Sequence, residues 1–224
     1  MQALVVLIDV DHTLLDGALV RARITEAVAG ELGARAVERF WELYEVVRAQ
    51  LGRVDVPEVT ARLERELGHR EGAALEAIER ANFETCLHAG ALDALAYLGA
   101  LGVTVVLSDG DPRFQRVKID SAGIAAAVGD RVMITTRKER ELDDVERRFP
   151  AERYAIFDDR VGILAAVKAQ LGERVTTVLV RQGRYADELE SVLRGAAPVT
   201  PDVVVGSIRD VLRLSRDVLL GDGA

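Results

Sequence analysis

Three short clusters of acidic and small polar residues could do chemistry together in this sequence. They are Asp9, Asp11 and Thr13; Ser108, Asp109 and Gly110; and the pair Asp158 and Asp159. Carboxylates gathered at one point repel each other, and a hard divalent cation such as Mg²⁺ relieves that repulsion through oxygen ligands. Asp9 and Asp11 are separated by one residue, so in an extended segment both side chains project to the same side. One of them could attack phosphorus while the other moves a proton.

Each cluster follows a segment with the pattern of a buried strand. Residues 3–8 are ALVVLI, which is typical of a parallel strand that is covered on both faces. Further strands are expected at 103–107, 131–135, 154–157, 176–180 and, as a short sixth strand, 203–205. Helices are expected at 92–101, 115–122, 139–148, 161–171 and 208–220. This alternation predicts an α/β fold with a Rossmann-like, doubly wound parallel sheet, whose ligands bind at the carboxyl ends of the strands.

The segment between the first two strands has a different pattern. Helical spacing of apolar residues recurs over 23–32, 36–50, 57–67 and 71–86, with no convincing strand. That stretch is too long for a simple crossover, so it predicts an inserted all-α domain. We expect a core domain formed by 1–16 and 89–224 and a helical cap domain formed by 17–88. Residues 195–201 are expected to form a loop.

Composition excludes several classes of protein. The net charge of −8 argues against a nucleic-acid partner held by a general basic field. Cys86 is the only cysteine, so no internal disulfide can form, and a buried structural thiol is expected. No apolar run approaches the length of about 18 residues that a membrane span needs, and the first residues do not have the pattern of a signal peptide. We therefore expect a cytoplasmic protein with no membrane partner.

The motifs DVDHTLLDG, VVLSDGD and AIFDDRVGILAA, in this order and spacing, resemble those of the haloacid dehalogenase superfamily, mainly its phosphatases. The resemblance covers the chain outside the helical insertion. It implies that Asp9 is the nucleophile, that Asp11 is the general acid and then the base, and that Ser108 and the backbone N–H after it hold phosphoryl oxygens. It implies Mg²⁺ held by Asp9, the backbone carbonyl of Asp11, and Asp159 with help from Asp158. Ile163 and Leu164 stand where many relatives have a further acid.

The resemblance also requires a lysine that bridges the nucleophile and the phosphate. Lys138, 20 residues before Asp158, is favoured over Lys118, which follows Ser108 by ten residues. Thr13, Asp109, Gly110 and Lys118 are the predicted substrate-binding residues, although Asp109 also has the character of a turn residue. Cap residues that could contact substrate are Arg21, Arg23, Trp41, Tyr44 and Arg48. Arg181 and Arg184 follow the fifth strand and could reach the edge of the site.

The implied activity is Mg²⁺-dependent hydrolysis of a small phosphorylated metabolite through an aspartyl-phosphate. Asp11 disfavours a dehalogenase, because a halide leaves without needing a proton. A phosphomutase would also keep Asp11, so it stays an alternative, as does a non-catalytic protein that binds a phosphorylated ligand with the same fold. The oligomeric state and the substrate are left open.

Overall fold

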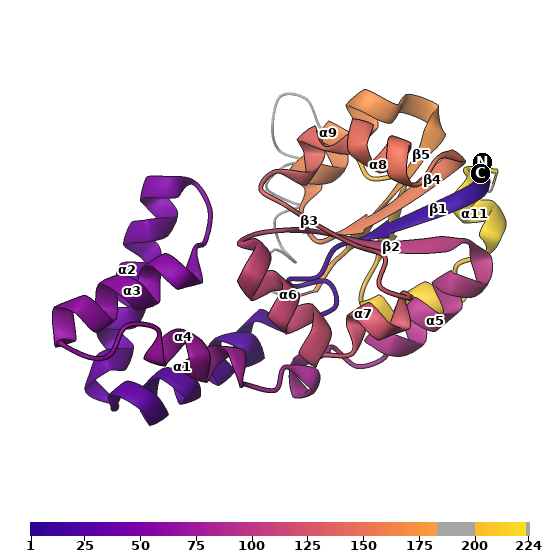
Figure 1. The fold of residues 1–224 in the computed structure, drawn as a ribbon. Coiled ribbons are helices and arrows are strands. Elements are labelled where there is room, and N and C mark those ends of the chain that lie inside the picture. The colour runs from indigo at the N-terminus through magenta and orange to yellow at the C-terminus, as the bar shows by residue number, and fades with distance from the viewer. Residues whose placement is uncertain (183–199, 223–224) are drawn as a thin grey trace.

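A six-stranded parallel sheet forms the centre of the computed structural model, which describes residues 1–182 and 200–222 (Figure 1). The strand order is β3-β2-β1-β4-β5-β6. The strands are β1 (Gln2–Ile8), β2 (Val103–Asp109), β3 (Val132–Thr135), β4 (Ala151–Asp158), β5 (Val175–Val180) and β6 (Val203–Val205). All strand pairs are parallel. The predicted doubly wound sheet is confirmed, and β1 lies in its interior between β2 and β4.

Side chains of β1 alternate between two apolar layers. Val6 and Ile8 pack with α5 (Ala91–Leu101), α6 (Pro112–Ser121) and α7 (Ile124–Ala127) on one face. Val5 and Leu7 pack with α8 (Leu142–Arg148) and α9 (Val161–Leu171) on the other face. Successive side chains of a strand point to opposite faces, so an unbroken apolar run is what a sheet covered on both sides requires. The burial of β1 holds its carboxyl end at a fixed position in the centre of the sheet edge.

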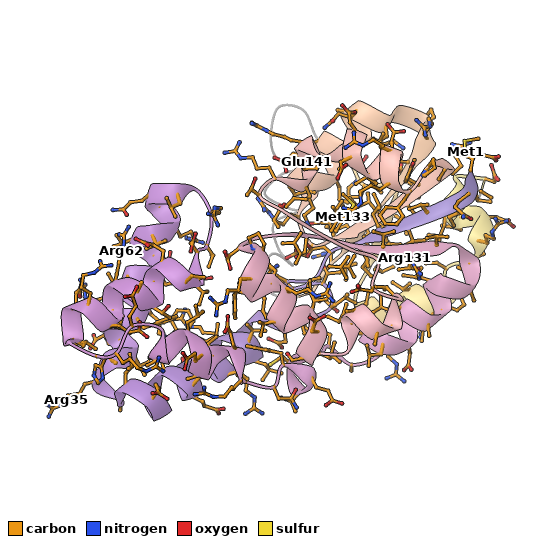
Figure 2. The ribbon with its side chains drawn as sticks, in the orientation of Figure 1. Met1, Arg35, Arg62, Arg131, Met133 and Glu141 are labelled. Atoms are coloured by element: carbon orange, nitrogen blue, oxygen red, sulfur yellow. The ribbon has the colours of Figure 1, made fainter. Side chains whose placement is uncertain are left out.

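The helical insertion follows β1 and lies to one side of the sheet (Figure 1). It contains α1 (Gly17–Leu32), α2 (Arg35–Leu51), α3 (Val56–Leu67), α4 (Ala73–Glu79) and the 3-10 turn η1 (Glu84–Cys86). Figure 2 draws the side chains of the insertion and of the sheet domain. Two of the contacts between them come from α6. Arg113 Nη2 donates to Glu79 Oε2 at 2.8 Å, and the rings of Phe114 and Phe83 meet edge to face with centroids 6.0 Å apart. The insertion is confirmed, whereas its division from the core at 17 and 88 stays a prediction.

Two predicted helices were too long. The 71–86 segment stops being α-helical after Glu79, and the Asn82 side chain accepts from the Glu84 N–H at 2.8 Å, a local bond that competes with the helix. The 208–220 segment is a 3-10 helix, η5 (Ile208–Arg213), followed by α11 (Arg216–Leu220). Ser215 caps α11 by accepting from the Val218 N–H, so a new helix begins there and the segment is not one continuous helix.

Other local predictions need smaller changes. The 139–148 helix is divided into the 3-10 turn η2 (Lys138–Arg140) and α8. The expected loop at 195–201 falls mostly outside the described residues. Across 1–182 and 200–222, no helix is both long enough and apolar enough to cross a membrane.

Candidate active site

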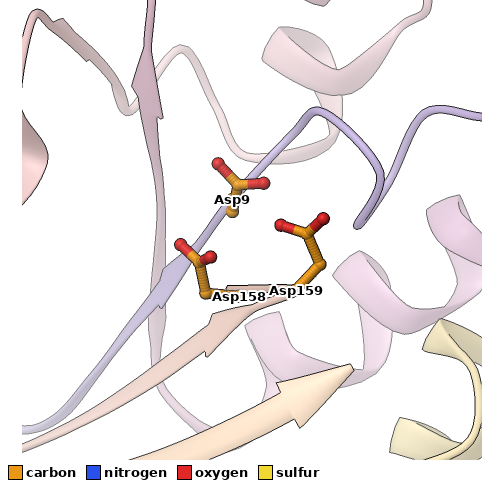
Figure 3. Close-up of side chains that lie close together, drawn as sticks. All are labelled: Asp9, Asp158 and Asp159. Atoms are coloured by element: carbon orange, nitrogen blue, oxygen red, sulfur yellow. The ribbon is translucent and has the colours of Figure 1, made fainter. Parts of the chain in front are cut away.

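Three aspartates from neighbouring strands meet at the carboxyl edge of the sheet. Asp9 follows β1, while Asp158 ends β4 and Asp159 comes next (Figure 3). The Asp9 N–H donates to the carbonyl of Phe157 at 3.0 Å, which extends the pairing of β1 and β4 to the site. One carboxylate oxygen of each aspartate lies within 4.8 Å of those of the other two, and all three residues are buried. The predicted convergence of the first and third clusters is therefore present.

Lys138 occupies the same cluster. Its Nζ donates to Asp9 Oδ1 and, at 2.7 Å, to Asp158 Oδ2, with 2% of the residue exposed. Asp109 determines where this lysine lies, because its Oδ1 accepts from the Lys138 N–H at 2.6 Å and from Thr135 Oγ1 at 2.9 Å. The Asp109 carboxylate thus positions Lys138, and the predicted contact of Asp109 with substrate stays a prediction.

The cluster is short of positive charge. When all groups are ionised, three carboxylates and one ammonium group sum to −2. Burial, with repulsion from Asp158 and Asp11, raises the pKa of Asp9 to about 7 despite the attraction of Lys138. Burial and the charges of Asp9 and Asp158 raise the pKa of Asp159 to about 9. The carboxylates overcome burial at Lys138 and raise its pKa, so it stays protonated.

The donor set fits a divalent cation. Asp159 Oδ2 is buried and, among the residues that the structure describes, has no hydrogen-bond partner. A buried polar atom without a partner is costly, and a bound cation would satisfy it. The side-chain ligands are all carboxylate oxygens, the type that Mg²⁺ prefers. The side chain of Asp11 is directed elsewhere, so any contribution of Asp11 to a metal would come from its backbone carbonyl.

Asp11 is held by two residues of α6. Lys118 Nζ forms an ion pair with Asp11 Oδ1, and Gln115 Nε2 donates to Asp11 Oδ2 at 2.9 Å. Burial acts to raise the pKa of Asp11, but the Lys118 charge and the hydrogen bonds from Lys118 and Gln115 outweigh it and lower the pKa. Asp11 is therefore ionised in this arrangement. The two candidate lysines contact different aspartates, and Lys138 is the one that contacts Asp9.

A tight loop joins Asp9 to the cap. The N–H groups of Leu14 and Leu15 both donate to the Val10 carbonyl at 2.9 Å, and His12 has a left-handed backbone with φ of 66°. Asp16 then caps α1 by accepting from the Ala18 N–H at 2.7 Å. The loop thereby reverses the chain directly after the two aspartates and starts the helical insertion beside them.

The other predicted site residues lie in or around this edge. Ser108 is buried near the end of β2, and its Oγ accepts from Gln115 Nε2 at 2.7 Å. The Gly110 N–H donates to the Thr135 carbonyl at 2.9 Å, so this N–H is already hydrogen-bonded within the sheet. Thr13 is buried, and its Oγ1 has no hydrogen-bond partner within the described part of the chain. Gln115 links Ser108 to Asp11, and the substrate contacts of Thr13 and Gly110 stay predictions.

Structural comparison assigns the family. No protein-family model and no curated protein matches the chain. A solved structure from Burkholderia xenovorans LB400, described as a putative haloacid dehalogenase-like hydrolase, matches with 36% identity over 97% of this chain and 98% of that chain, with a TM-score of 0.84. This chain belongs to the haloacid dehalogenase-like hydrolases. The family predicted from the three motifs is confirmed.

More distant members show the same fold. The L-2-haloacid dehalogenase from Xanthobacter autotrophicus is 21% identical over 94% of this chain and 97% of that chain, with a TM-score of 0.59. The HAD-hydrolase YfnB from Bacillus subtilis, solved with bound magnesium, is 15% identical over 95% of this chain and 98% of that chain, with a TM-score of 0.61. At these identities the comparisons describe the architecture of this hydrolase and leave its substrate open.

Gln115 is the site residue of this hydrolase that sequence reasoning missed. It is 2% exposed and touches both Asp11 and Ser108. The available signal was its spacing from Lys118, because residues three apart lie on the same face of a helix. Gly110 is required beside it, since a Cβ there would come within 2.7 Å of Gln115 Cγ, and φ at Gly110 is 148°.

The cap places a group of cationic and aromatic side chains near Asp11. The Arg21 guanidinium lies 3.5 Å from the centroid of the Trp41 ring, and the Trp41 and Tyr44 rings are tilted by 59° with their centroids 5.1 Å apart. Burial and the charge of Asp11 raise the pKa of Tyr44 to about 12. Arg23 and Arg48 instead form ion pairs with Glu26 and Glu45 within their own helices. Their predicted contacts with substrate, and that of Arg181, stay predictions, and Arg184 lies outside the described residues.

Proposed function

We propose that this hydrolase is a Mg²⁺-dependent phosphatase that acts on a small phosphorylated metabolite through an aspartyl-phosphate on Asp9. The observation that supports this most directly is the buried Asp9, Asp158 and Asp159 cluster, whose charge exceeds that of Lys138 and whose Asp159 Oδ2 has no partner among the described residues. A carboxylate that attacks a phosphate ester must approach a second anion. Mg²⁺ bound by these three residues would supply the charge that keeps the two anions in contact.

The residues divide the reaction into two halves. In the first, an Asp9 oxygen bonds to phosphorus, the bond from phosphorus to the ester oxygen breaks, and Asp11 gives a proton to that oxygen. In the second, Asp11 takes a proton from water, the water oxygen bonds to phosphorus, and Asp9 leaves as a carboxylate with inorganic phosphate. Lys138, fixed by Asp109, favours the ionised form of Asp9 that the attack requires, and a bound Mg²⁺ would favour it further. Ser108 would donate to a phosphoryl oxygen.

Lys118 has a role in the proton balance of this scheme. Its ion pair with Asp11 favours the ionised carboxylate, which is the form that the second half of the reaction needs. The first half needs Asp11 protonated. A phosphate dianion that attracts the Lys118 ammonium would weaken the ion pair and let Asp11 hold a proton. This scheme agrees with the predicted contact of Lys118 with substrate.

Asp11 also separates a phosphatase from a dehalogenase. A halide leaves as a stable anion and needs no proton, so a half-buried acid held by two side chains would have no task in that reaction. A chloroalkanoate is also less highly charged than a phosphate monoester, which reduces the need for a divalent cation. A phosphomutase remains an alternative, because it differs only in the acceptor of the phosphoryl group.

The test is hydrolysis of p-nitrophenyl phosphate by the metal-free and Mg²⁺-loaded protein, with chloride release from 2-chloropropionate measured in parallel. We expect phosphate release only with Mg²⁺, no chloride release, and loss of turnover in Asp9→Asn. Asp93→Asn, an exposed residue of α5, is the matched control and should retain full activity. Full phosphatase activity in Asp9→Asn, or chloride release as the main reaction, would refute the proposal.

A further inference from the structure

Gln115 connects two groups of the site that have different tasks in the proposed reaction. Its Nε2 lies 2.9 Å from Asp11 Oδ2, 2.7 Å from Ser108 Oγ and 2.9 Å from the Asp109 carbonyl. The side chain comes from the first turns of α6, where Asp111 caps the helix by accepting from the Phe114 N–H at 2.8 Å. A capped helix start and burial hold the amide in one position.

The contact with Ser108 determines where the serine hydroxyl points. A hydroxyl has a single hydrogen, and here its oxygen accepts from Gln115. The serine hydrogen is therefore free to point toward a phosphoryl oxygen at the sheet edge instead of being used on Gln115. In the absence of the Gln115 amide, this constraint on the serine hydroxyl is lost, and the hydroxyl could turn toward another acceptor.

The contact with Asp11 fixes the orientation of that carboxylate. Gln115 holds Oδ2 while Lys118, one helical turn further along α6, holds Oδ1. When the phosphate attracts Lys118, Gln115 is the contact that keeps Asp11 directed at the leaving oxygen. A bound phosphate attracts the Lys118 ammonium but not the neutral Gln115 amide. The hydrogen bond from Gln115 to Asp11 is therefore kept.

We propose that Gln115 is a positioning residue that aims both the Ser108 hydroxyl at the phosphoryl group and the Asp11 carboxylate at the leaving oxygen. This inference rests on the proposed phosphatase function. It predicts that loss of the amide affects substrates unequally. An alkoxide leaving group needs the proton of Asp11, whereas p-nitrophenolate leaves without one, and general acid catalysis contributes about 10²- to 10⁴-fold where it is needed.

The experiment compares Gln115→Met with wild type on p-nitrophenyl phosphate and on β-glycerol phosphate. Methionine keeps the length and volume of the side chain and removes the donor. We expect kcat/KM to fall about tenfold on p-nitrophenyl phosphate, through Ser108, and about 100-fold or more on β-glycerol phosphate, through both groups. Gln2→Met makes the same chemical change at the exposed start of β1, seven positions before Asp9, and should leave both values unchanged.

A double-mutant cycle separates positioning from a general loss of structure. In an Asp11→Asn background, Gln115→Met should no longer change the ratio of kcat/KM between the two substrates, because the acid is already absent. Equal losses on both substrates in the single variant, or no loss, would overturn the inference. Thermal unfolding checks each variant, and Gln115→Ala, which adds no bulk against Gly110, replaces the methionine variant if that variant does not fold. If wild type hydrolyses both substrates, the proposed function holds, and a failure of the Gln115 inference can be recognised separately.

Discussion

Asp159→Asn should stabilise the metal-free protein while removing its response to Mg²⁺. Asp159 is 2% exposed, and repulsion and burial raise its pKa from 3.8 to about 9. The folded protein must therefore take up a proton at this carboxyl at pH 7, where the unfolded chain leaves it ionised. A carboxyl whose pKa is raised by folding destabilises the fold increasingly as pH rises from the unfolded value to the folded one. Asparagine has the same shape and no such cost.

The magnitude follows from the interval between the ordinary pKa and the pH of the measurement. From 3.8 to pH 7 is about three pH units at about 1.36 kcal/mol each, so the replacement should add at most about 4 kcal/mol at pH 7. At pH 5 the same reasoning leaves about 1.6 kcal/mol. The gain should therefore grow with pH over this range and level off near pH 9.

Urea unfolding in EDTA at pH 5, 6 and 7 measures the difference, and repetition with Mg²⁺ measures the metal effect. Wild type should gain about 2.7 kcal/mol when Mg²⁺ is 100 times its Kd, and Asp159→Asn should gain little. The matched control is Asp202→Asn. Asp202 forms an ion pair with Lys168 at 3.0 Å and accepts from the Thr177 N–H at 2.8 Å, so this variant should lose stability. A loss of stability in metal-free Asp159→Asn, or a gain independent of pH, would refute the electrostatic account of the cluster.

Three further changes test other parts of the structure. Lys138→Met leaves Asp9 and Asp158 without their buried ammonium and should cost about 3 kcal/mol or more in urea unfolding, whereas Lys168→Met, at a half-exposed pair, should cost less than about 1 kcal/mol. Mg²⁺ affinity measured by calorimetry should weaken with falling pH below 7. The expected change is up to about 100-fold per pH unit, because Asp9 and Asp159 both have raised pKa values and each must lose a proton to bind metal. A Kd independent of pH would contradict this. In Gly99→Ala, in α5, the added Cβ meets nothing within 4 Å, so this variant should be about 0.5–1 kcal/mol more stable. Gly102→Ala places a Cβ 2.7 Å from the Leu4 carbonyl oxygen and should lower stability by about 1–3 kcal/mol. Equal shifts of the thermal unfolding midpoint in the two variants would show that the packing argument is wrong.

Sequence patterns predicted most of the properties that depend on neighbours along the chain. The apolar run of β1 indicates a strand covered on both faces, and the residues that follow buried parallel strands must lie at one edge of the sheet. For this reason the convergence of Asp9, Asp158 and Asp159 is predictable from the amino-acid sequence. The helix at 161–171 was predicted with the bounds that the structure shows, and it ends at Gly172, whose φ is 57°.

The family resemblance favoured Lys138, but the atoms that hold each side chain across distant segments were decided by the tertiary structure. Lys138 reaches Asp9 because the Asp109 carboxylate, 29 residues earlier, holds its backbone N–H, and a periodic pattern contains no information about such a bond. Lys118 and Gln115 meet Asp11 only because α6 packs beside the loop that follows β1. The pKa values of Asp9 and Asp159 likewise depend on burial and on each other's charge, which are properties of the assembled sheet edge. The local sequence thus determined which groups are available, and side-chain packing across the sheet determined their partners and their charge.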